Sequence, residues 1–224
     1  MKTTPFRKLS PLMLSSLVVL AGCAAEPEVA APSGQAGPET GVSSVQAARQ
    51  APADAFMQRL ASHCGQAFAG RIVADVPPPE GEDPFSGKPL VMNVRSCEPD
   101  TLKVPFHVGD DPSRTWVITR TDTGLRLKHD HRHEDGSPDP VTQYGGDTDD
   151  AGTAVRQSFP VDAESVAMFG REGLKASIQN TWAMEIEPGK RFLYELSRPG
   201  GRLFQVEFDL SQPVELPPAP WGHE

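Results

Sequence analysis

The sequence is short of aromatic residues and of positive charge. Aromatic residues make up only 7% of the 224 positions, and 21 Lys and Arg stand against 30 Asp and Glu, a formal net charge of −9. Nucleic-acid binding relies on clustered basic residues, so this balance argues against a nucleic-acid partner. The sequence also lacks a Gly-x-Ser-x-Gly motif, a P-loop and a dinucleotide-binding fingerprint. These absences favour a binding protein over an enzyme, without deciding the question.

Long helices are not expected either, because proline is abundant. The chain has 23 prolines, about a tenth of its residues and roughly twice the usual ~5%. Proline breaks the interior of a helix, so the composition argues strongly against a helical bundle or a coiled coil.

The N-terminus has the layout of a secretory signal. An apolar stretch over residues 9–20 follows the basic residues Lys2, Arg7 and Lys8, and no acidic residue precedes Glu26. The stretch is shorter than the ~20 apolar residues that span a bilayer. A basic start, a short apolar run and small residues after it predict a cleaved signal segment.

The apolar stretch ends in Leu20-Ala21-Gly22-Cys23, which resembles the lipobox of bacterial lipoproteins. The resemblance implies cleavage before Cys23 and attachment of diacylglycerol to its sulfur, so that lipid anchors the mature chain to a membrane. Ala24 follows instead of Asp, which in the enteric sorting rule implies the outer membrane of a Gram-negative bacterium, with the domain in the periplasm or at the cell surface. The alternative is an ordinary signal peptide in which Cys23 is incidental.

The composition predicts four segments. We expect a signal peptide over 1–22, a lipidated Cys23 with a disordered tether over 23–51, an antiparallel β-domain over 52–216 and a Pro-rich tail over 217–224. Residues 24–50 contain no aromatic residue and cannot bury enough apolar surface to offset their ordering entropy. Since residues 1–22 hold three basic and no acidic residues, cleavage would leave a net charge of −12.

The domain is expected to begin with a short helix and to continue as short strands. A helix is predicted over 54–64, with Asp54 as its N-cap and Gly65 after its end, and a second short helix over 162–170 with Asp162 as N-cap. The strands are expected over residues 68–75, 89–95, 102–108, 115–121, 125–133, 141–145, 154–159, 181–187, 191–197 and 202–210.

This pattern predicts a mainly β fold, an antiparallel β-barrel or sandwich. The last three strands alternate apolar and polar residues and are joined by Gly-containing turns, and such sequential hairpins favour a barrel. A short helix followed by Phe68-Ala69-Gly70 is similar to the start of lipocalin-like proteins, which implies a meander of that kind. The Gly-x-Trp of that family is absent, and the resemblance implies architecture only.

Two cysteines remain in the predicted domain. Cys64 and Cys97 would lie in the oxidising cell envelope, where such a pair usually forms a disulfide. A pair of metal-binding thiolates is the alternative, although no Cys-x-x-Cys spacing supports it.

A strip of alternating histidines is the main candidate site. In a strand, His129, His131 and His133 would share a face with Leu125 and Leu127. We therefore expect the three imidazoles to line the barrel lumen or mouth and to contact a small-molecule ligand. The intervening residues are expected to face water: Arg126, Lys128, Asp130, Arg132 and Glu134.

Two other interpretations of the strip stay open. Neighbouring imidazoles suit Zn²⁺, so His129, His131 and His133 are also candidate ligands of a metal carrier or a metal-dependent enzyme. The third interpretation is a structural envelope protein whose histidines bond only to their neighbours. A cavity above ~300 Å³ lined by the histidines would favour the first two, and a filled interior would favour the third.

Two further segments carry a resemblance. Tyr144-Gly145-Gly146-Asp147 and Pro220-Trp221-Gly222 resemble segments of an uncharacterised proteobacterial envelope family. The resemblance implies a place in the envelope and no activity. We also expect Trp221 to pack on the barrel.

Overall fold

The structure, a computed structural model, describes residues 39–78, 81 and 83–223. The predicted signal peptide, the lipobox with Cys23 and the first part of the predicted tether lie outside these residues.

Antiparallel strands dominate the described part, which confirms the prediction of a mainly β fold. The strands are β1 (Ala67–Val76), β2 (Leu90–Asn93), β3 (Ser96–Cys97), β4 (Thr101–Val108), β5 (Asp111–Thr121), β6 (Gly124–His131), β7 (Tyr144–Asp147), β8 (Arg156–Pro160), β9 (Thr181–Glu187), β10 (Arg191–Arg198) and β11 (Arg202–Val214). The helices are α1 (Glu39–Ala61), α2 (Ala163–Arg171) and the 3₁₀ helix η1 (Lys175–Gln179).

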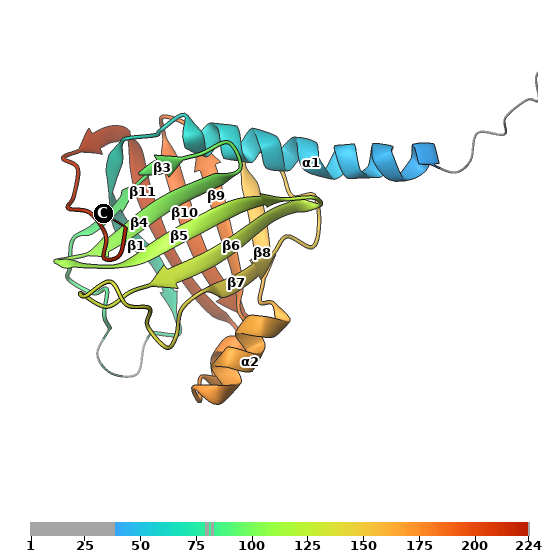
Figure 1. The fold of residues 1–224 in the computed structure, drawn as a ribbon. Coiled ribbons are helices and arrows are strands. Elements are labelled where there is room, and N and C mark those ends of the chain that lie inside the picture. Colours follow the sequence, from blue (N-terminus) through green and yellow to red (C-terminus); the bar gives the residue numbers. More distant parts are fainter. Residues whose placement is uncertain (1–38, 79–80, 82, 224) are drawn as a thin grey trace, which may run out of the picture. The chain divides into compact units, whose positions relative to one another are not determined.

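The strands form one sheet that curls into a nearly closed barrel (Figure 1). Their order is β7-β6-β5-β4-β2-β1-β11-β10-β9-β8, with β3 paired to β4 beside this path. Two runs of sequential hairpins are thus joined where β1 pairs with β11. The edge strands of this path are β7 and β8.

The two edges meet at a pair of glycines. The backbone N–H of Asp162, just after β8, donates to the Gly145 carbonyl oxygen at 2.9 Å, and the Gly145 N–H donates to Ser165 Oγ at 2.9 Å. A Cβ atom on Gly146 would overlap the Pro160 carbonyl oxygen. The close approach that closes the barrel therefore requires glycine at position 146.

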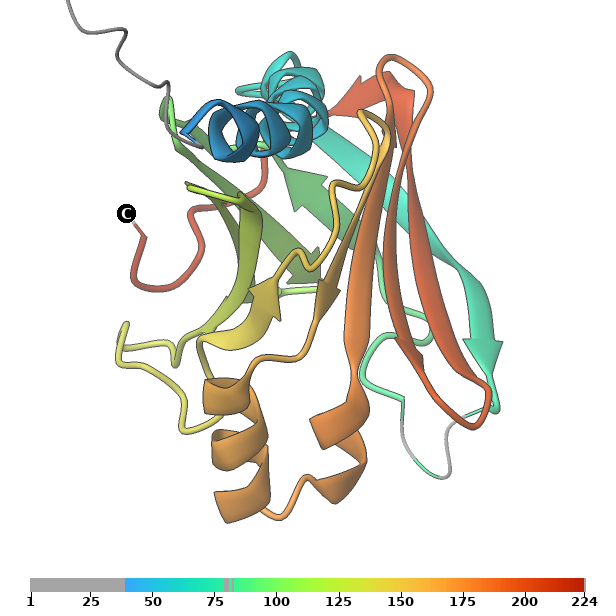
Figure 2. The same ribbon diagram turned by 90° about the vertical axis from the view of Figure 1, so that its right-hand side faces the viewer.

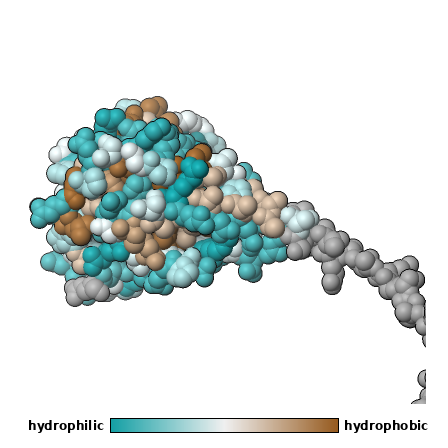
Figure 3. All heavy atoms as spheres, turned by 90° about the horizontal axis from the view of Figure 1, so that it is seen from above, coloured by the Kyte–Doolittle hydropathy of each residue, from teal (hydrophilic) through white to brown (hydrophobic). Residues whose placement is uncertain are grey.

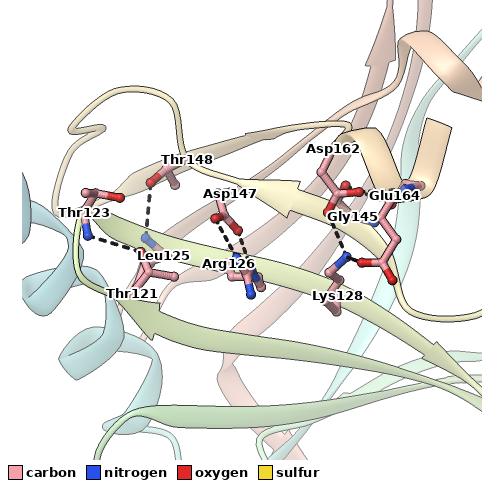
Figure 4. A network of polar contacts seen from close by, with 11 residues as sticks. Thr121, Thr123, Leu125, Arg126, Lys128, Gly145, Asp147, Thr148, Asp162 and Glu164 are labelled. Carbon is pink, nitrogen blue, oxygen red and sulfur yellow. Dashed lines mark hydrogen bonds and ion pairs between the residues drawn. The ribbon is translucent and has the colours of Figure 1, made fainter. Parts of the chain in front are cut away.

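Ion pairs on the outside support the same closure (Figure 4). Arg126 on β6 forms a bidentate ion pair with Asp147 on β7, with N–O distances of 2.6 and 2.9 Å. Lys128 Nζ lies 2.7 Å from Asp162 and 3.4 Å from Glu164, at the start of α2. Asp162 is also the N-cap that the sequence predicts, because its Oδ1 accepts from the Ser165 N–H at 2.7 Å.

The N-terminal helix is present but begins earlier than predicted. It starts at Glu39, so residues 39–51, predicted as disordered tether, belong to α1. The side-chain amides of Gln46 and Gln50 both donate to the Asp122 carbonyl, at 2.9 and 2.8 Å, and hold this half of α1 against the β5–β6 turn. Asp54 lies inside the helix and pairs with Arg120 instead of capping.

Helix α1 lies at one end of the barrel and α2 at the other (Figures 1 and 2). Four residues of α1 are buried in the core: Ala53, Phe56, Met57 and Leu60. From the side of α1, hydrophilic residues surround smaller groups of hydrophobic ones (Figure 3). Among the described helices, none is long and apolar enough to cross a membrane.

The predicted disulfide is confirmed. The sulfur atoms of Cys64 and Cys97 are 2.06 Å apart, and the bridge ties the turn after α1 to β3. The C-terminal segment also contacts the barrel, since the N–H of the partly buried Trp221 donates to the Pro112 carbonyl at 3.3 Å.

Substituting Gly146→Ala should open the junction of β7 and β8. The added methyl group meets backbone rather than a movable side chain, so we expect a loss of about 2 kcal/mol or more in the free energy of unfolding, measured in urea. Gly170→Ala is the matched control, because no atom lies within 4 Å of a Cβ there and alanine favours the helix. Equal stability of the two variants would contradict the assigned role of Gly146.

Candidate functional site

A cavity of about 380 Å³ occupies the barrel end that α2 and η1 flank. Most of its apolar wall is aromatic, and six of these aromatic residues are inward-facing strand residues: Phe106, Trp116, Tyr144, Trp182, Tyr194 and Phe204. On the side of the helices, Phe169 and Leu174 complete the wall. The cavity thus lies between the filled core near α1 and the outside.

The aromatic rings of this wall support one another. Trp116 stacks between Phe106 and Tyr194, with ring centroids 5.0 and 4.5 Å apart and planes inclined by 18° and 20°. Stacked rings lose little freedom when a ligand arrives, because neighbours already fix their orientation. The wall is therefore a rigid, flat apolar surface.

Polar residues occupy the next inward-facing positions beyond the aromatic wall, on the side away from the filled core. Arg114 precedes Trp116 by two residues, Asn180 precedes Trp182 by two, and Arg202 precedes Phe204 by two. Since alternate residues of a strand share a face, the lumen changes from apolar to polar at this level. We call the polar level the mouth; it contains Asp75, Asp83, Arg114, His131, Asn180, Arg198 and Arg202.

Most charges of the mouth are compensated. Arg114 pairs with Asp111 at 2.5 Å, and Arg202 pairs with Asp75. Among the mouth residues two buried polar atoms have no hydrogen-bond partner, Asn180 Oδ1 and Arg198 Nε. Buried polar atoms are usually bonded, so these two are available to a bound molecule.

His129 is buried in the cavity wall, with 3% of its surface exposed. Its Nδ1 lies 3.1 Å from the Tyr144 carbonyl, which can only accept, so Nδ1 carries the proton. Its Nε2 therefore accepts from the Tyr194 hydroxyl at 2.8 Å. Burial, with a smaller contribution from His131, lowers the pKa of His129 to about 3, so the ring is neutral.

His131 also faces the cavity, as predicted, and its Nε2 lies 3.1 Å from the Tyr144 hydroxyl. Burial, together with the neighbouring Arg114, lowers the pKa of His131 to about 4. Burial raises the pKa of Tyr144 and of Tyr194, which keeps both hydroxyls protonated. At neutral pH His129 and His131 are therefore uncharged hydrogen-bonding groups.

His133 does not join the other two, contrary to the prediction of one shared face. Strand β6 ends at His131, and the following turn places His133 at the surface, 3.9 Å from Asp139. Both ring nitrogens of His129 are already bonded. Among the residues that the structure describes, no group of three or more His, Cys, Asp or Glu is arranged to hold a metal ion.

Asp130 was expected to face water, but only 2% of its surface is exposed. Its carboxylate accepts from Gln143 Nε2 at 2.7 Å and Arg132 Nε at 3.1 Å, and His223 Nε2 lies 2.5 Å from it. Burial opposes the charge, but the bonds from His223 and Arg132 keep the pKa of Asp130 below its usual value. Lys128 is likewise mostly buried, whereas Arg126 is half exposed.

Sequence reasoning about the site missed the arginines of the mouth and both tyrosines. A signal was available for the arginines, since continuing the alternation of β5, β10 and β11 by one step reaches Arg114, Arg198 and Arg202. Comparisons with known protein families, with curated proteins and with solved structures found no match.

Acidification should destabilise the protein through the two cavity histidines. Their pKa values of about 3 and about 4 lie below the usual 6.5, so the unfolded chain takes up protons that the folded protein excludes. Their contribution is complete above pH 6.5 and is lost as pH falls toward 4, by up to about 1.4 kcal/mol per pH unit for each ring.

Urea unfolding at pH 7, 6 and 5 checks this expectation. His131→Gln should show a shallower loss of stability than the wild type, and His133→Gln at the surface controls for the substitution itself. Identical slopes for the wild type and His131→Gln would contradict the assigned protonation of His131.

Proposed function

We propose that this chain is a lipid-anchored protein of the bacterial envelope whose barrel binds a small, largely apolar molecule. The observation that carries the binding function is the cavity of about 380 Å³, walled by aromatic rings and containing buried polar atoms without partners. Small-molecule sites combine such a volume of roughly 300–1,000 Å³ with a few polar groups among apolar walls.

The contrast between the two barrel ends supports binding over a purely structural role. Near α1 the lumen is filled by completely buried side chains such as Phe56, Leu60 and Met184. Near α2 the lumen holds space for roughly a dozen waters, at ~30 Å³ each. A barrel needed only as a scaffold gains stability by filling this space, because lining atoms without neighbours lose dispersion contacts.

The histidines support a ligand site without metal. His129 and His131 are neutral at pH 7, and tyrosine groups hold their rings in place. As uncharged groups in an aromatic wall, they suit a polar atom of an organic ligand. A metal site using His129, His131 and His133 has less support, because His133 lies outside the cavity.

The anchoring part of the proposal rests on the sequence. Leu20-Ala21-Gly22-Cys23 follows a basic and then apolar segment, the arrangement that directs lipid attachment to the cysteine. Several acyl chains on one terminus anchor stably, at about 0.8 kcal/mol for each buried CH₂ group. The disulfide between Cys64 and Cys97 agrees with an oxidising compartment.

A neutral aromatic dye, N-phenylnaphthylamine, should bind in the cavity with an increase in dye fluorescence. Leu196 lines the cavity, so Leu196→Trp should fill part of it and weaken binding about tenfold or more. Val73→Trp, on an exposed position of β1, is the matched control and should bind like the wild type. If the wild type does not bind the dye, or if both variants bind it equally, the cavity is not the site.

Cys23→Ser should release the protein from membranes. In a Gram-negative host we expect the wild type in the carbonate-washed membrane fraction, carrying palmitate label, and the variant in the soluble fraction without label. Ala24→Ser leaves the cysteine in place and is the control. Retention of Cys23→Ser on the membrane would contradict lipid anchoring.

A further inference from the structure

The charges at the cavity mouth leave one cation unpaired. Arg114 pairs with Asp111 and Arg202 pairs with Asp75. Within the described residues Arg198 forms no ion pair, and its buried Nε has no hydrogen-bond acceptor. Asp83, the remaining described carboxylate of the mouth, accepts from the Phe85 N–H at 2.9 Å. Within the described residues the mouth therefore holds one guanidinium, that of Arg198, without a carboxylate partner.

The position of Arg198 explains why it faces the cavity. It is the last residue of β10 and follows Phe192, Tyr194 and Leu196 on the inward face. Burial, and then the neighbouring Arg202, lower the pKa of Arg198, which reflects the cost of holding its charge there. An unpaired charge out of water is unfavourable and is retained where a partner compensates it.

The other end of the same strand provides the contrast. Arg191, also on β10, lies outside the barrel and pairs with Glu185 at 2.8 Å and Glu187 at 2.9 Å. The sheet thus surrounds its external arginine with carboxylates and provides none for Arg198. Since no carboxylate of the described residues pairs with Arg198, a ligand from outside the chain can take that place.

A second polar group lies at the same level. Asn180 is 4% exposed, lines the cavity and has an Oδ1 atom without a partner. The side-chain amide can present its NH₂ group instead of its oxygen by rotating about its terminal bond. Asn180 can therefore donate to an oxygen atom that also contacts Arg198.

We infer that the ligand of this cavity is an organic monoanion, whose carboxylate or sulfonate oxygens bind Arg198 at the mouth while its apolar body lies against the aromatic wall. This inference rests on the proposed binding function and specifies the chemical class of the ligand. A guanidinium presents parallel N–H donors that match the oxygens of such a group. Since Arg198 alone among the arginines of the mouth lacks an ion-pair partner within the described residues, one anionic group is enough to pair with it.

Two dyes with the same ring system test the inference. Anilinonaphthalene sulfonate differs from N-phenylnaphthylamine by its sulfonate group, so their relative affinity isolates the contribution of the negative charge. We expect the wild type to bind the sulfonate about tenfold or more tightly than the neutral dye, since a charge-assisted hydrogen bond contributes at least this much.

Arg198→Met should remove this preference, so that the two dyes bind the variant with similar affinity. Arg191→Met removes an arginine from the outside of the same strand and should keep the wild-type preference. Arg198→Met should also unfold at the same or a higher temperature than the wild type, because it removes a partly buried charge and no ion pair.

The outcomes separate the two levels of the proposal. Equal affinity of the wild type for both dyes, or an equal loss of both in Arg198→Met, overturns the inference while leaving a binding cavity. A marked fall in the unfolding temperature of Arg198→Met also overturns it, since the residue then serves the fold. If neither dye binds the wild type, the proposed function fails and the inference fails with it.

Discussion

The approach of Gly145 and Gly146 to the backbone of Pro160 and Asp162 is the contact on which the barrel depends. It joins the edge strands β7 and β8, which share no ladder of their own along the sheet. Without it, the sheet would end in two exposed edges, and the lumen would be an open groove. The same contact places Tyr144, the residue before Gly145, flat against His129, with ring centroids 4.5 Å apart. The contact that closes the barrel therefore also positions part of the cavity wall.

Because every second residue of a strand faces inward, successive inward residues pass through three parts of the lumen: the filled core, the cavity wall and the mouth. On β10, Phe192 belongs to the filled core, Tyr194 to the cavity wall and Arg198 to the mouth. The core excludes water, the wall offers rigid apolar surface, and the mouth offers charge. The gradient follows from strand geometry, because each step of two residues moves a side chain about 6.6–7 Å further along the lumen.

Local patterns predicted the parts of the structure that local interactions determine. The hairpins of β9, β10 and β11 match the predicted strands closely, because alternation and turn glycines lie within the same few residues. The cap at Asp162 is equally local. The lumen positions of His129 and His131 follow from the register of β6, whereas His133 departs from it because the strand ends two residues earlier.

What sequence reasoning missed depends on contacts between distant segments. The early start of α1 goes with the bonds from Gln46 and Gln50 to Asp122, more than 70 positions away. The burial of Asp130 depends on His223, 93 positions along the chain. Neither partner is marked by its neighbours in the sequence. Of the three tryptophans, Trp116 and Trp182 belong to the cavity wall, and Trp221 lies in the C-terminal segment. The intrinsic ultraviolet emission of the unlabelled protein therefore reports mainly from the walls of its own cavity, and libraries of colourless compounds can be screened by that signal.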